Sequence, residues 1–181
     1  YFLDIQGVTT LQSSQLLMGM ATGLMAGGFL FAWLAPKLRI MKKLVVFGSS
    51  SSGLMFLIIA FLPPTDTYLL MGFVCIQGIL CGYGVLIISH VKTLMPQHMM
   101  GRGLTLANLF GFGGVGCMQL LSGWIMNKFD TSGGIYPAPA YTALFTTVAC
   151  LMLAATLFYL MTKEADLMSP AGNIPNPQPP K

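Results

Sequence analysis

Five stretches of mostly apolar residues alternate with short polar breakers along the chain. The stretches cover residues 13–35, 44–62, 68–91, 103–126 and 140–162. Each is close to the ~20 residues that an α-helix needs to cross the hydrocarbon core of a bilayer. The breakers, around Pro36, Pro63 and Pro96 and at 131–139, hold residues that end helices. This pattern predicts five transmembrane helices, because a helix satisfies its own backbone hydrogen bonds inside lipid.

The composition points to the same class of protein. Of the 181 residues, 55% are hydrophobic and 8% are charged, whereas soluble domains carry about 25% charged residues. A chain this short cannot bury so much apolar surface in a water-soluble core. We therefore expect an all-α, polytopic membrane helix bundle that has the lipid bilayer as its partner. The net charge of +4 is spread over short loops, which is not typical of a nucleic-acid-binding surface.

The ends of the chain differ from the bundle at 13–162. Residues 1–12 are typical of the extracellular or periplasmic end of a preceding helix and its loop, so we expect further sequence upstream of Tyr1. Residues 163–181 end in a proline-rich run with few residues that could pack, which predicts a disordered tail.

The basic residues predict the orientation in the membrane. If the first helix runs inward, one face of the membrane receives Lys37, Arg39, Lys42, Lys43, Lys92, Arg102, Lys163 and Lys181, and the other receives Lys128 alone. Short cytoplasmic loops are enriched in lysine and arginine. We therefore predict an integral protein of the cell (inner) membrane with its N-terminus outside and its C-terminus, with the tail, in the cytoplasm.

Glycines recur at spacings of four in two of the predicted helices. Gly19, Gly23 and Gly27 share one face of the first helix, and Gly78 and Gly82 repeat the spacing in the third. Small residues four apart let two helix backbones approach closely, so these glycines predict close helix packing. A helix that slides against its neighbour would use the same kind of surface.

The fourth apolar stretch carries a polar stripe. Asn108, Phe112, Val115, Gln119 and Ser122 fall within ~40° of one line along a helix with 3.6 residues per turn. Two neutral amides on one face would be costly against lipid, so the stripe is expected to face protein or a water-filled cavity. Both a lining of a solute pocket and hydrogen bonding between helices remain open.

Other polar positions are weaker candidates. Gln77 is the single amide of the third helix, and Gln15 and Thr22 share a face of the first. The serines at 49–52 span ~300° of a helix and cannot all point at one site, so we interpret them as structural. His90 lies near the cytoplasmic end of its helix and is expected at the membrane interface. The four cysteines are expected to be small buried hydrophobes.

The chemistry of an enzyme is missing from the sequence. No charged residue lies in the middle of a predicted span, and no metal-ligand cluster, nucleophile–base pair or phosphate-binding loop is present. We expect neither an enzyme nor a bound cofactor or metal. A carboxylate that couples transport to an ion would have to lie in another part of the protein.

The stretch LMPQHMMGRGLTLANLFGFGGVGCMQLLSGWIMNKFD resembles the eleventh helix of major facilitator superfamily transporters and the loop before it. The likeness is carried by Pro96, Gly101, Arg102, Asn108, Gly111, Gly114, Gln119 and Gly123. The loop after the first helix is similar to the basic cytoplasmic motif of that family through Gly28, Lys37, Arg39, Lys42 and Lys43. The acid and the second glycine of that motif are missing here.

The resemblance implies that the chain covers the end of the seventh helix and the eighth to twelfth helices of a transporter. In the family, the eighth, tenth and eleventh helices line the central cavity, which makes Gln77, Asn108 and Gln119 possible substrate contacts. The implied function is secondary active transport of a small solute by alternating access, with the missing N-terminal half of the same transporter as partner. The alternative is a structural or assembly subunit of a membrane complex that transports nothing.

Overall fold

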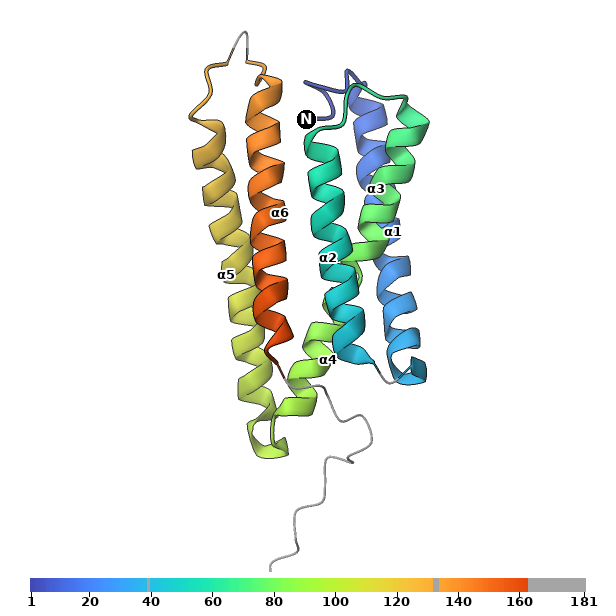
Figure 1. Cartoon of the computed structure of the whole chain (residues 1–181), viewed down its shortest axis with the longest axis vertical. Helices are drawn as coiled ribbons and strands as arrows, with labels where there is room; N and C mark the ends of the chain where they lie inside the picture. The colour runs from blue at the N-terminus through green and yellow to red at the C-terminus, as the bar shows by residue number, and fades with distance from the viewer. Residues whose placement is uncertain (39, 132–133, 163–181) are drawn as a thin grey trace, which may run out of the picture.

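The computed structural model describes residues 1–38, 40–131 and 134–162, apart from the side chains at positions 94 and 97. Arg39 and the predicted tail at 163–181, with Lys163 and Lys181, lie outside the described residues. The helices are α1 (Thr10–Leu38), α2 (Met41–Ala60), α3 (Thr67–Cys81), α4 (Gly84–Leu94), the short 3₁₀ turn η1 (Gln97–Met99), α5 (Met100–Met126) and α6 (Ala138–Leu160) (Figure 1).

The all-α class and the five apolar spans are confirmed. Thr10–Leu38, Met41–Ala60, Thr67–Thr93, Met100–Met126 and Ala138–Leu160 are long and apolar enough to cross a membrane. The helices differ from the predicted stretches by a few residues at their ends. Pro36, predicted to lie in a breaker, is instead inside the last turn of α1. By length and composition, the chain is an integral membrane protein.

The third predicted span, 68–91, is confirmed as the apolar stretch Thr67–Thr93, within which the helix is interrupted. α3 ends at Cys81 and α4 begins at Gly84. At the break the backbone tightens to contacts three residues apart: Gly82 N donates to Ile79 O at 3.0 Å, and Leu86 N donates to Tyr83 O at 2.9 Å. Such a 3₁₀ step bends a helix.

Packing on both sides accounts for this break. Gly82 is pressed against the backbone of α1 at Gly27 and Gly28. A Cβ built on Gly48 of α2 would lie 2.7 Å from the Cβ of Tyr83. Beyond the bend, α4 contacts α5 as well as α1 and α2 (Figure 1).

α1 and α3 meet through the glycines that share the four-residue spacing, which are Gly19, Gly23, Gly27, Gly78 and Gly82. A Cβ on Gly23 would lie 2.5 Å from the carbonyl oxygen of Cys75. A Cβ on Gly78 would collide with the backbone of Met20 in return. An added Cβ would meet backbone atoms at Gly23, Gly27, Gly78 and Gly82, where only glycine fits, and the side chains of Met71 and Cys75 at Gly19.

The remaining helices divide into a well-packed group and one outlier. α2 packs along α6, while α5 contacts α6 and α4 only lightly. Of the residues of α5, only Gly103 and Ile125 are buried. In Figure 1, α5 lies at the edge of the bundle, beside α6. A helix this apolar and this exposed requires lipid, further protein or both around it.

Candidate functional site

The polar stripe of α5 lies on an uncovered part of the bundle. Asn108, Val115 and Gln119 are all exposed, and Val115 keeps 56% of its surface. The hydroxyl of Ser122 donates a hydrogen bond to the backbone oxygen of Gln119 at 2.8 Å, as serines in membrane helices commonly do. The side-chain amides of Asn108 and Gln119 form no hydrogen bond within the described residues. Both therefore remain available for groups outside the described residues.

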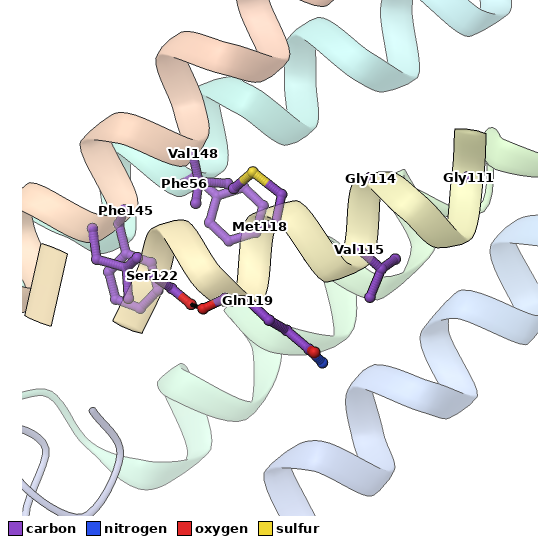
Figure 2. A pocket seen from close by; sticks show the side chains of 10 residues that line it. Phe56, Gly111, Gly114, Val115, Met118, Gln119, Ser122, Phe145 and Val148 are labelled. Carbon is purple, nitrogen blue, oxygen red and sulfur yellow. Dashed lines mark hydrogen bonds between the residues drawn. The ribbon is translucent and has the colours of Figure 1, made fainter. Parts of the chain in front are cut away.

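A cleft runs between α5, α6 and α2 beside this stripe. It has a volume of about 570 Å³, and its lining consists of Phe56, Gly111, Gly114, Val115, Met118, Gln119, Ser122, Leu144, Phe145 and Val148. Figure 2 shows Phe56, Met118 and Val148 gathered between the three helices, whereas Gln119 points away from them into open space. Of the two predicted amides of α5, Gln119 is part of the lining of the cleft and Asn108 is not.

Gln77, the third predicted site residue, lies elsewhere. It is 3% exposed and sits in the contact between α3 and α2. Its amide nitrogen donates a hydrogen bond to the Ser52 hydroxyl oxygen at 2.8 Å and contacts the Cys81 sulfur at 3.6 Å. Within the described part of the chain, its Oε1 has no hydrogen-bond partner. The structure therefore does not bring Gln77 together with Asn108 and Gln119.

Two of the serines at 49–52 take part in contacts between helices, which the helical periodicity does not indicate. The Ser49 hydroxyl of α2 lies 2.5 Å from the Thr156 hydroxyl of α6. Ser52 bonds Gln77 of α3. The two serines are three positions apart and both are buried, so they connect α2 with helices on two of its sides.

His90, expected at the membrane interface, lies in the second half of α4 and is buried between helices. Its side chain is 2% exposed. Its Nδ1 lies 2.5 Å from the hydroxyl oxygen of Tyr159 on α6, and the two rings meet edge to face at 5.6 Å. This hydrogen bond connects α4 to α6. The sequence carries no signal for it, because the two residues are 69 positions apart.

Charge and aromatic residues mark the two ends of the bundle. One end carries Lys37, Lys42, Lys43, Lys92 and Arg102, and the other carries Lys128 with the described acidic residues Asp4, Asp66 and Asp130. The amine of Lys37 lies 3.7 Å from the ring centre of Trp33, and that of Lys128 lies 3.6 Å from the ring centre of Trp124. Tryptophan and lysine near helix ends are typical of the membrane–water boundary.

Comparisons of the chain with family models, with curated proteins and with solved structures found no match. Among the described residues, no group of three or more His, Cys, Asp or Glu side chains could hold a metal ion. The described chain is therefore defined by its fold: an integral membrane protein with five apolar helices, one of them broken.

Proposed function

We propose that the chain forms most of one half of a secondary transporter of the major facilitator type. It would move a small solute across the cell membrane by alternating access, together with the other half of the same transporter. The observation that carries the proposal is the polar stripe of α5. Two exposed amides, Asn108 and Gln119, lie about three turns apart on one face of an apolar, membrane-length helix. Such a face is costly unless it borders a cavity or protein.

The distribution of charge supports the orientation that this function requires. All described basic residues except Lys128 lie at the end of the bundle with the α1–α2 and α4–α5 connections, and no described acidic residue lies there. The positive-inside rule places this end in the cytoplasm. The N-terminus then lies outside and residue 162 lies at the cytoplasmic side.

The broken third span also suits a transporter. Discontinuous helices are common at the substrate sites of secondary transporters. Here α3 is held against α1 by glycine contacts, while α4 contacts α5 beyond the bend at Gly82. A change of angle at the bend would therefore shift α5, with its polar stripe, relative to α1.

The alternative is a structural or assembly subunit. The α1–α3 glycine contact favours it, because such close backbone packing also serves permanent assembly. In that case the α5 stripe would bond to a neighbouring protein, and no water would reach it.

Water accessibility along α5 distinguishes the two functions. Single cysteines replace Asn108, Val115 and Gln119 in the full-length protein after the native cysteines are replaced by alanine. The matched controls are Leu109→Cys and Leu120→Cys, which lie ~100–120° around the helix and are also exposed in the described chain. A transporter predicts labelling of the three stripe positions by a water-soluble maleimide and protection of the two controls by lipid. Protection of all three stripe positions would reject the transporter.

A second measurement tests the role of the amides themselves. Once a solute is known, Asn108→Leu and Gln119→Leu are expected to reduce its flux at unchanged expression in the membrane. Unchanged flux in both variants would remove these residues from the solute pathway.

A further inference from the structure

The two tryptophans of the chain occupy matching positions at opposite ends of the bundle. Trp33 lies about one turn before Lys37 in α1, and Trp124 of α5 lies about one turn before Lys128. The amine of each lysine lies over the ring of its tryptophan, at 3.7 Å in the first pair and 3.6 Å in the second. Both tryptophans are more than half exposed. Each pair therefore lies on the outer surface of the bundle, where it meets the membrane.

An exposed apolar ladder leads along the helix to each pair. In the α1 ladder, Met25 and Phe29 precede Trp33 at a spacing of four residues, and both are exposed. In the α5 ladder, the exposed Leu120 precedes Trp124 at the same spacing. Residues four apart lie above one another on a helix. In a bilayer such a ladder runs along an acyl chain, and the lysine at its end reaches the level of the lipid phosphate. Both surfaces therefore suit a phospholipid molecule.

The charge around the two pairs differs. Lys42 and Lys43 follow Lys37 across the short connection between α1 and α2, and no described acidic residue lies at this end of the bundle (Figure 1). At the other end, Lys128 is the single described basic side chain, and Asp130 follows it two positions later. The surface at Lys37 therefore carries a net positive charge, whereas the charges around Lys128 offset one another.

The positive charge at the α1–α2 connection is directed away from the core of the bundle. Ala35 of α1 and Met41 of α2 belong to the buried hydrophobic cluster at this end. Around their helices, Lys37 lies about 160° from Ala35, and Lys43 lies about 160° from Met41. Both lysines are exposed, and Lys43 forms no hydrogen bond or ion pair within the described residues. Their charge is therefore open to a partner in the surrounding membrane.

We propose that an anionic phospholipid binds at the α1–α2 connection, with its phosphate on Lys37 and Lys43 and an acyl chain along the α1 ladder. Basic clusters directly beside a membrane helix commonly bind anionic lipids. A zwitterionic phospholipid fits this surface less well, because the lysines repel the cationic group next to its phosphate. The α5 ladder, where the charges offset one another, accepts both kinds of lipid. The inference does not depend on transport, nor on which side of the membrane carries the basic end.

Quenching of tryptophan fluorescence by brominated lipid measures the preference at each ladder. Two variants of the full-length protein each keep one tryptophan, Trp33 or Trp124, and every other tryptophan is replaced by phenylalanine. Both variants are reconstituted into phosphatidylcholine vesicles that contain increasing fractions of dibrominated phosphatidylglycerol or, as the reference, of dibrominated phosphatidylcholine. Bromine quenches a tryptophan only at contact distance. The two quenching curves therefore give the relative binding constant of the anionic lipid at each tryptophan.

The two tryptophans are expected to differ. Phosphatidylglycerol should bind at Trp33 roughly tenfold more tightly than phosphatidylcholine, since a basic residue near an anionic lipid surface contributes roughly fivefold. At Trp124 the two lipids are expected to bind within about twofold of each other, because the nearby charges offset one another. Equal binding of the two lipids at Trp33 overturns the proposal. An equal preference for phosphatidylglycerol at both tryptophans also overturns it, since the attraction would then belong to the whole protein.

Removing the two charges assigns the preference to the lysines. Lys37→Gln combined with Lys43→Gln, in the variant that keeps Trp33, is expected to lower the relative binding constant of phosphatidylglycerol to the value found at Trp124. Both lysines are exposed, so the substitutions leave the core of the bundle intact. Because both lipids are measured on the same variant, the loss of the Lys37 contact with the Trp33 ring affects both curves and cancels in their ratio. A preference that survives the double substitution overturns the proposal.

Discussion

The amide nitrogen of Gln77 lies 2.8 Å from the hydroxyl oxygen of Ser52 and donates a hydrogen bond to it between α3 and α2. Both side chains are buried, and Ser52 also lies 3.3 Å from the Cys81 sulfur. An amide held in this way stabilises a helix contact. In the described chain, Gln77 is therefore part of the packing between helices.

Removing the serine hydroxyl tests this assignment. Ser52→Ala takes away the acceptor and leaves a buried amide poorly paired, so we expect a loss of about 1–2 kcal/mol in the free energy of unfolding. Adding Gln77→Met to Ser52→Ala is expected to recover part of this loss, because it removes the unpaired amide at similar volume. Unfolding by dodecyl sulfate in mixed micelles measures all three proteins.

Ser14→Ala is the matched control for this series. Ser14 is exposed and donates to the backbone oxygen of Thr10 in its own helix at 3.0 Å. Its replacement is expected to change the free energy of unfolding by less than ~0.5 kcal/mol. If Ser52→Ala behaves like Ser14→Ala, the Gln77–Ser52 bond contributes nothing to the helix contact.

The close contact of α1 and α3 allows a comparison of two adjacent glycines. A Cβ on Gly27 would collide with the backbone at Ile79, which cannot move without parting the helices. A Cβ on Gly28 would meet only the Val85 side chain, at an ordinary 3.6 Å. We expect Gly27→Ala to destabilise the bundle by about 1–3 kcal/mol and Gly28→Ala to be neutral or slightly stabilising. Equal stability of both variants, measured by thermal unfolding, would contradict the packing described.

Much of this fold could be predicted from the sequence, because the signals are local. Lengths of apolar runs define the five spans, and glycine spacing marks the faces of α1 and α3 where backbones meet. Each signal depends on the residues of one helix and on the thickness of a bilayer.

The details of the polar contacts could not be predicted in this way. Ser49 to Ser52 cover most of a helix circumference, so only the positions of α3 and α6 determine that Ser49 and Ser52 are buried. The break at Gly82 arises from close contacts with α1 and α2 rather than from a helix-ending residue. Gln77 is a possible substrate contact only through the resemblance, and the polarity of an amide does not distinguish a solute contact from a hydrogen bond between helices.

The contact of His90 with Tyr159 provides a third test. Tyr159→Phe removes the hydroxyl that lies 2.5 Å from His90 Nδ1 but keeps the ring contact between α4 and α6. We expect a loss of about 1 kcal/mol in the free energy of unfolding, since a buried hydrogen bond is lost. Tyr68→Phe serves as control because Tyr68 is 88% exposed. An equal loss of unfolding free energy in Tyr68→Phe and Tyr159→Phe would show that the buried hydrogen bond contributes nothing specific to stability.

The lysine–tryptophan pairs at opposite ends of the bundle test the orientation. Lys37 on Trp33 and Lys128 on Trp124 place one cation near each end of the bundle. Since the basic end is expected in the cytoplasm, Lys128→Cys in cysteine-free, full-length protein is expected to react with a membrane-impermeant maleimide on intact cells. Lys37→Cys is expected to react only after the cells are opened. Labelling of Lys37→Cys on intact cells would show that the topology is opposite to the predicted one. The cytoplasmic and outer ends of the polar stripe of α5 would then be exchanged.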